Sequence, residues 1–266
     1  MNNDYDCLNA YYTSYNEDGR LLSQHGQVEY LTTMTYIRKY LRPGSRVLEI
    51  GAGTGRYSAA LAAEGYDVTA VELVAHNLDI LRSKITPDMT LRAIRGNALD
   101  LTMLESEAFD LTLVLGPMYH LYGEADKKRA ISEALRVTKP GGIVMAAYSI
   151  SDASIIEYVF KGGHLREVLD DGMLDPVTFV TSSDPSAEYL FEMVRKPDID
   201  RLMANFPVER LHYVATDGFT YFMRREVDEM DQETFGMFLK YHLTVCENPD
   251  LVGATAHSLD IFRRLN

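Results

Sequence analysis

Hydrophobic and polar residues recur along this chain with two periods, one typical of helices and one of buried strands. Residues 28–41 carry apolar side chains at steps of three and four, which predicts an amphipathic helix ended by Pro43-Gly44. The run 109–116, FDLTLVLG, is almost continuously apolar, as expected of a strand covered on both faces. The same reasoning predicts strands over 46–51, 67–73, 90–95 and 142–149, and helices over 55–64, 75–85 and 125–138.

The second half of the chain has a less regular pattern. Residues 1–25 are likewise only weakly periodic, so no element is predicted there. The elements predicted after residue 150 are a helix over 154–170 interrupted at Gly162-Gly163, two strands within 177–194 around Ser183-Asp184-Pro185, a helix over 198–206, a strand over 208–215, a helix over 229–246 and a last strand over 257–265.

Strands that alternate with helices predict an α/β fold, in which a doubly wound parallel sheet carries helices on both faces. Ligands of such sheets bind beyond the carboxyl ends of the strands. Because the 266 residues contain no internal repeat and no low-complexity linker, we expect one domain over 1–266. Its expected parts are an N-terminal helical cap over 1–45, a nucleoside-binding core over 46–150, and a substrate-side insertion with the final strands over 151–266.

The charge balance and the cysteine count of the chain argue against several classes of protein. The 26 basic and 39 acidic residues give a net charge of −13, whereas a protein that binds a phosphate backbone usually carries a basic face. Nucleic acid is therefore a disfavoured partner. Cys7 and Cys246 are too few for a disulfide framework or a zinc cluster. The N-terminus lacks the regions of a signal peptide and no run is long enough to span a membrane, which predicts a cytoplasmic protein.

The most informative segment joins the first predicted strand to the next helix. Gly51, Gly53 and Gly55 form a glycine-rich turn, and glycines let a ligand approach the backbone closely. A dinucleotide-binding turn has its third glycine where this chain has Arg56, which argues against a dehydrogenase. The next strand ends in Glu72, 19 residues beyond Gly53, where a carboxylate can accept hydrogen bonds from both hydroxyls of a ribose.

The segment E-x-G-x-G-x-G, led by Glu49 and followed by an acidic end to the next strand, resembles the class I S-adenosylmethionine (SAM) dependent methyltransferases. This resemblance implies a seven-stranded, mostly parallel Rossmann-like sheet with an antiparallel last strand. It also implies SAM as the cofactor and S-adenosylhomocysteine (SAH) as the product. The loop after the third strand would hold the adenine, although Asn97 stands where the family usually has Asp. The implied cofactor-binding residues are Glu49, Gly51, Gly53, Gly55, Glu72, Leu73, Asn97, Ala98 and Leu115.

The residues from Gly116 to His120 follow the fourth strand, and in the family this turn lies beside the sulfonium of SAM. His120 is the candidate general base, because an imidazole titrates near neutrality, and Tyr119 is the candidate for orienting the acceptor. A structural His120 bonded to the backbone is an equal alternative. Gly116 argues against methylation of the amines of nucleic-acid bases. No acidic residue lies between Leu111 and Gly123, so no metal is indicated.

The N-terminal segment is a second candidate for catalytic residues. Arg20, His25 and Glu29 precede or begin the first certain helix, and the last two share a face if helical. Related methyltransferases fold such a segment over SAM, which makes these residues candidates for a lid. The alternative is a surface helix with a local ion pair.

The preferred function is transfer of a methyl group to O, N or S of a small molecule, with substrate specificity expected within 150–240. Two alternatives stay open, namely a protein or RNA methyltransferase and a non-catalytic SAM-binding sensor or partner subunit. We expect a monomer or a homodimer that binds a small-molecule methyl acceptor and no membrane.

Overall fold

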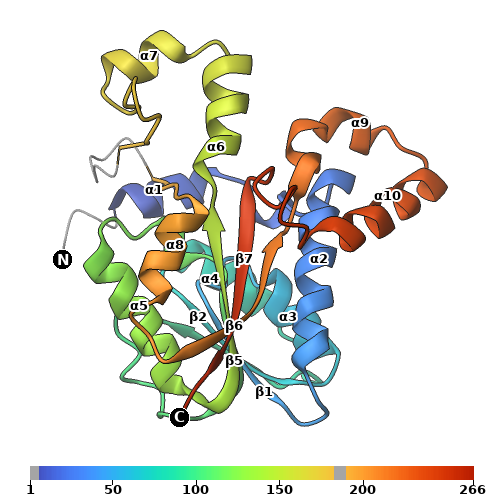
Figure 1. The fold of residues 1–266 in the computed structure, drawn as a ribbon. Coiled ribbons are helices and arrows are strands. Elements are labelled where there is room, and N and C mark those ends of the chain that lie inside the picture. The colour runs from blue at the N-terminus through green and yellow to red at the C-terminus, as the bar shows by residue number, and fades with distance from the viewer. Residues whose placement is uncertain (1–5, 183–189) are drawn as a thin grey trace.

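The computed structural model describes residues 6–182 and 190–266, which contain a seven-stranded sheet in the order β3-β2-β1-β4-β5-β7-β6 (Figure 1). Strands β1 to β5 run parallel, and β7 pairs antiparallel with β5 and β6. The sheet predicted from the sequence is therefore confirmed, antiparallel last strand included. The strands are β1 (Arg46–Ile50), β2 (Asp67–Glu72), β3 (Leu91–Arg95), β4 (Phe109–Val114), β5 (Thr138–Ser149), β6 (Val208–Ala215) and β7 (His257–Arg264).

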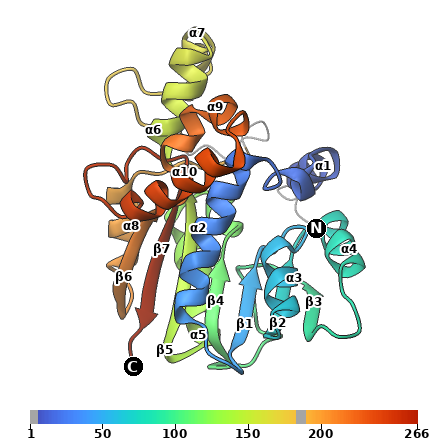
Figure 2. The same cartoon turned by 90° about the vertical axis from the view of Figure 1, so that its right-hand side faces the viewer.

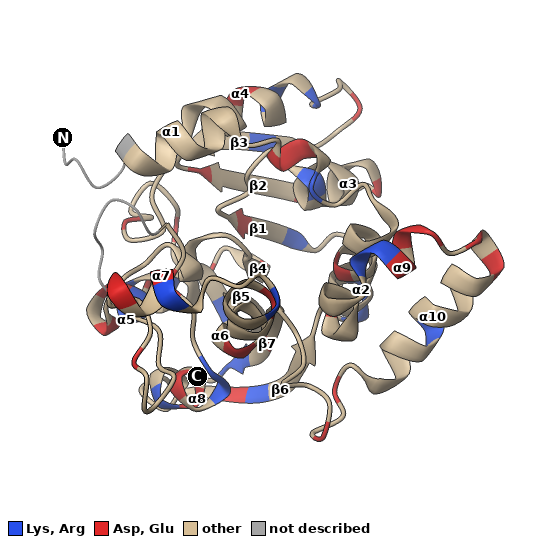
Figure 3. Cartoon of the chain, turned by 90° about the horizontal axis from the view of Figure 1, so that it is seen from above, with Lys and Arg blue, Asp and Glu red and all other residues tan. Residues whose placement is uncertain are grey.

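Helices cover both faces of the sheet (Figure 3). One face packs against α2 (Gln24–Tyr40) and α3 (Arg56–Ala63), and Val47 of β1 points into this layer. The other face packs against α5 (Glu124–Val137) and α8 (Lys196–Met203), and Leu48 points into that layer. Because successive side chains of a strand point to opposite faces, Glu49 shares the α3 side with Val47.

The upper ends of the strands lie beneath the N-terminal cap and the helices of the second half (Figure 2). In the part of the chain that the structure describes, no helix is long and apolar enough to cross a membrane. The remaining helices are α1 (Asp6–Ser14), η2 (Glu17–Gly19), α4 (Ala75–Ser83), η3 (Pro117–Tyr119), α6 (Ser151–Ser154), the π-helix η4 (Ile155–Lys161), α7 (Leu165–Asp170), η5 (Gly218–Phe222), α9 (Arg224–Asp228) and α10 (Gln232–Val245).

Most predicted elements are confirmed, and the strand over 208–215 matches β6. The fifth strand begins earlier than the predicted start at residue 142. Strand β5 begins at Thr138, directly after α5, and residues 139–142 form a bulge because Phe109 pairs with Thr138 and Leu111 with Ile143.

The two strands expected within 177–194 are wrong for the residues that the structure describes there. Only single bridges form, between Thr181 and Leu174 and between Val194 and Ile150. The predicted turn at 183–185 lies outside the described residues. The weak periodicity of residues 1–25 also concealed α1, whose Tyr11 packs against aromatic rings and not in the main core.

Candidate functional site

The glycine-rich turn after β1 touches the loop after β4. The backbone N–H groups of Gly51 and Ala52 both donate to the carbonyl of Val71, at 2.8 and 3.1 Å. Gly51 has a φ of +71°, and a Cβ built on it would lie 2.7 Å from Cδ of Pro117. No side chain fits between the two loops, so glycine at position 51 lets them meet at the upper edge of the sheet.

Glu72, at the end of β2, fixes the shape of this turn. Its Oε2 accepts a hydrogen bond from the N–H of Gly53 at 2.7 Å, and its Oε1 accepts one from the N–H of Val74 at 2.8 Å. The side chain is buried, and burial raises the pKa of its carboxyl group above the ordinary value. A carboxylate has about four acceptor sites, and because Asn77 also donates to this one, about one site remains for a ligand hydroxyl.

A cavity of about 470 Å³, called the first cavity below, lies at the upper ends of β1, β2 and β4. This volume is typical of a small-molecule site. Six of the nine predicted cofactor-binding residues line it, namely Gly51, Gly53, Glu72, Leu73, Asn97 and Ala98.

The other three predicted cofactor residues do not line the first cavity. Glu49 is 2% exposed and lies behind the turn, where its carboxylate accepts a hydrogen bond from the hydroxyl of Ser58 in α3. Burial raises the pKa of Glu49 to about 8. Gly55 is the N-cap of α3, and a Cβ built on it would lie 2.6 Å from Cγ of Leu81. The carbonyl of Leu115 accepts a hydrogen bond from the hydroxyl of Tyr119 at 3.0 Å.

Two asparagines place amide groups at the first cavity. The side-chain oxygen of Asn97 accepts a hydrogen bond from the N–H of Leu99 at 3.0 Å. Asn77 of α4 is 2% exposed and hydrogen-bonds the Glu72 carboxylate, but its Oδ1 has no partner among the described residues. Asn77 was not predicted from the sequence, because one asparagine in a helix has no distinguishing spacing.

His120 bridges the loop after β4 and the N-terminal cap. Its Nδ1 lies 2.7 Å from the carbonyl of Leu190, and its Nε2 lies 2.8 Å from the hydroxyl of Tyr12. Since a carbonyl only accepts, Nδ1 carries the hydrogen and Nε2 accepts from Tyr12. Burial lowers the pKa of His120 to about 4, so the ring is neutral at pH 7. In this arrangement neither nitrogen is available to take a proton from an acceptor.

The N-terminal cap sits on the glycine-rich turn. Lys84 contacts the carboxylate of Asp18 and donates to the carbonyl of Thr54 at 2.8 Å, which ties η2 to the turn. Cγ of Glu17 lies 3.7 Å from the position of a Cβ on Gly53, and Glu17 lines the first cavity. The cap therefore lies along one side of that cavity.

A second cavity, of about 590 Å³, lies between the cap and the second half of the chain. Tyr12, Glu17 and Tyr119 line both cavities. The second cavity has aromatic walls, where the rings of Tyr11 and Tyr15 stack at 5.2 Å and Phe191 packs edge-on against Tyr11 at 5.6 Å.

The predicted lid residues all line the second cavity, where Arg20 and Glu29 form an ion pair and His25 contacts a carboxylate. Arg20 donates to both oxygens of Glu29, at 2.9 and 3.1 Å, and to Glu17 at 3.1 Å. His25 binds Asp228 of α9 through its ring, at 2.7 Å, and through its backbone N–H, at 2.9 Å, and so ties α2 to α9.

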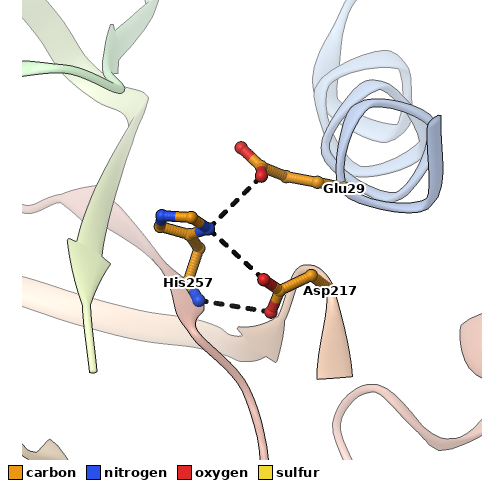
Figure 4. Close-up of side chains that lie close together, drawn as sticks. All are labelled: Glu29, Asp217 and His257. Carbon is orange, nitrogen blue, oxygen red and sulfur yellow. Dashed lines mark hydrogen bonds and ion pairs between the residues drawn. The ribbon is translucent and has the colours of Figure 1, made fainter. Parts of the chain in front are cut away.

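His257, which was not predicted from the sequence, completes this cluster (Figure 4). Its Nδ1 lies 3.3 Å from an oxygen of Glu29 and 3.3 Å from an oxygen of Asp217. Burial alone would lower the pKa of His257, but the two carboxylates outweigh it and raise that pKa to about 10. No spacing in the sequence joins residues from such distant segments.

The comparisons with known proteins agree with this geometry. A family model described as a methyltransferase domain matches residues 48–146. A demethylmenaquinone methyltransferase from Renibacterium salmoninarum is 34% identical over 60% of this chain and 63% of its own length. A glycine/sarcosine N-methyltransferase from Aphanothece halophytica is 28% identical over 74% of this chain and 71% of its own length.

A solved SAM-dependent methyltransferase from Methanosarcina mazei shares the fold, with a TM-score of 0.58 at 17% identity over 86% of this chain and 97% of the other. The chain covers 60% to 63% of the length of three demethylmenaquinone methyltransferases that it resembles. Residues 48–146 thus match a methyltransferase domain, and the order of the strands is the one that the resemblance to class I, SAM-dependent methyltransferases predicts.

Proposed function

We propose that the protein transfers the methyl group of SAM to a small molecule bound in the second cavity. The observation that carries this proposal is that Tyr12, Glu17 and Tyr119 line both cavities. A donor held in the first cavity therefore faces an acceptor held in the second across these three side chains. Residues 46–150 would bind SAM, residues 1–45 would cover it, and residues 151–266 would supply much of the acceptor side.

The residues of the first cavity fit SAM. Among the described residues, only Glu17 comes within 4 Å of the Cβ position of Gly53, so a ligand can lie against the backbone there. The first turn of α3 offers N–H groups and a positive dipole end to a carboxylate. Glu72 would accept from the ribose hydroxyls, and the partnerless Oδ1 of Asn77 needs a donor that the described residues do not provide.

When bound, SAM supplies an electrophilic methyl group, which leaves SAH behind as it moves to an O, N or S atom of the acceptor. The protein's task in such a displacement is alignment and exclusion of water. The hydroxyls of Tyr12 and Tyr119 are held by His120 and by the carbonyl of Leu115, so both rings stand in fixed positions between the cavities. His120 thus acts as a positioning residue.

The test is to incubate the pure protein with methyl-labelled SAM and an extract of the organism that produces it, and then to separate small molecules, protein and nucleic acid. The proposal expects label in the small-molecule fraction. Label in protein or RNA would move the acceptor to a macromolecule. Absence of label, with SAM binding established by titration, would favour a non-catalytic SAM-binding protein. We propose the cytoplasm as the place where the reaction occurs.

A further inference from the structure

His257 lines the second cavity, and the described carboxylates contact only one nitrogen of its ring, Nδ1. His257 is the first residue of β7, and its side chain is 31% exposed. Its Nδ1, however, is buried between Glu29 and Asp217 (Figure 4). The exposed part of the ring therefore lies on the side away from both carboxylates. Because His257 lines the second cavity, this side, which carries Nε2, faces the acceptor space.

The surroundings of His257 keep the ring charged. Glu29 of α2 and Asp217, just before η5, are the carboxylates at its Nδ1. Arg20 binds Glu29 and Glu17, so the two cations Arg20 and His257 lie among three carboxylates. Burial opposes a charge on the ring, but the carboxylates prevail and raise the pKa of His257 to about 10. At pH 7 the imidazolium therefore presents an N–H donor at Nε2 to the cavity.

A second cation lines the same cavity. Arg224 begins α9, and its side chain is exposed and stacked over the ring of Tyr221, with Cζ 4.1 Å from the ring centroid. Within residues 6–182 and 190–266, Arg224 forms no ion pair. Stacking leaves the edge of a guanidinium free to donate, and its fork geometry matches a carboxylate. The second cavity thus has two cationic groups, and among the described residues neither Nε2 of His257 nor the guanidinium of Arg224 forms an ion pair, although Glu17 also lines this cavity.

We propose that, given the methyl transfer inferred above, the acceptor carries a carboxylate on an apolar body, which the Nε2–H of His257 and the guanidinium of Arg224 bind. The aromatic walls of the second cavity, Tyr11, Tyr15 and Phe191, take the apolar body. His257 is in this account an acceptor-binding residue that sets substrate class.

The same side chains could be mistaken for a metal centre. One ligand atom from each of Glu29, Asp217 and His257 lies within 4.8 Å of the others. The guanidinium of Arg20, however, already donates hydrogen bonds to both carboxylate oxygens of Glu29. Oδ1 of Asp217 accepts hydrogen bonds from the backbone N–H groups of Ala256 and His257. A divalent cation would have to displace or tolerate the guanidinium, so the cluster is better suited to holding a protonated imidazole.

The test uses three probes of matched shape and different charge, namely benzoate, benzyl alcohol and benzylamine. Each is titrated into the full chain saturated with SAH, while NMR follows the labelled histidine rings. Benzoate is expected to shift the His257 signals and to bind at least tenfold more tightly than the other two. In the same spectra the titration midpoint of His257 is expected to lie well above that of an ordinary histidine, and Glu29→Gln should lower it.

His257→Phe should weaken benzoate binding at least tenfold, and Arg224→Gln should weaken it several-fold. His164→Gln is the matched control, because His164 lies outside the cavity in a pair with Glu167. SAH affinity should stay unchanged in all three variants, since none of these residues lines the first cavity. If His257→Phe does not fold, the affinities of the three probes for the unaltered protein still test whether the cavity prefers a carboxylate.

Preference for benzylamine, or benzoate binding that His257→Phe leaves intact, would overturn the carboxylate site. A shift of the His257 signals by equimolar Zn²⁺ would replace it by a metal site. Failure of SAH to bind would instead contradict the proposed function, so the two failures can be told apart.

Discussion

Glu72→Ala tests the assignment of the first cavity most sharply, because Glu72 serves both the turn and the expected ligand. The substitution removes the acceptor of two backbone N–H groups, those of Gly53 and Val74 at 2.7 and 2.8 Å. It also removes the carboxylate that is expected to accept hydrogen bonds from the ribose hydroxyls. A hydrogen bond to a charged group contributes about 1.5–3 kcal/mol, and each 1.4 kcal/mol is about a factor of ten in affinity. We therefore expect SAH to bind at least tenfold more weakly.

The assay is calorimetric titration with SAH at pH 7.5, with the fold of each variant checked by circular dichroism. Glu72→Gln keeps the shape but turns an amide donor toward one of the two backbone N–H groups, so an intermediate loss is expected. Asp67→Ala is the control, since Asp67 begins the same strand, and its side chain is 51% exposed and pairs only loosely with Arg46 at 3.5 Å. A folded Glu72→Ala protein that binds SAH within about twofold of the original would refute the reasoning.

The remaining predictions concern the surroundings of that cavity. Because burial raises the pKa of Glu49 to about 8 from an ordinary 4.5, the folded state keeps a proton between these values that the unfolded state releases. The free energy of unfolding should therefore fall as pH rises through this window, by about 1.4 kcal/mol per pH unit from this group, and Glu49→Gln should flatten that slope in urea titrations. An unchanged slope would show that another group is responsible. Gly51→Ala and Gly65→Ala both carry the cost of a positive φ, about 1–2 kcal/mol, but only position 51 lacks space for a Cβ. Gly51→Ala should thus lose SAH binding and Gly65→Ala should keep it, and equal affinities would contradict the close approach of the two loops. His120→Ala removes the anchor of Tyr12 and should raise the Kd of SAH about two- to tenfold, as expected for one neutral hydrogen bond. An unaltered Kd would mean that the cap does not depend on His120.

Structural features that depend on residues close together in the chain could be predicted from the sequence. The turn at Gly51–Gly55, the acid at Glu72 and the alternation of β7 each depend on neighbours within the same element, so pattern and spacing were sufficient. The role of Glu49 was harder to assign. Its spacing matched the family motif, but its side chain lies behind the turn on the α3 face and binds Ser58.

The second cavity could be predicted only in part, because tertiary contacts bring the N-terminal candidates Arg20 and Glu29 together with Asp217 and His257. Arg20, Glu29, Asp217 and His257 come from the cap, α2, the segment after β6 and the start of β7, and no local pattern brings these segments together. His120 shows the same limit. Its position after β4 was predictable, whereas its bonds to Tyr12 and to the carbonyl of Leu190 depend on segments 108 and 70 residues away.

The most direct measurement of the central claim is a crystal structure of the full chain with SAH. The account predicts that the ribose hydroxyls contact Glu72, that the adenine lies beside Asn97, and that the sulfur faces the second cavity between Tyr12 and Tyr119. A sulfur turned away from that cavity, or SAH bound within the second cavity itself, would contradict the account.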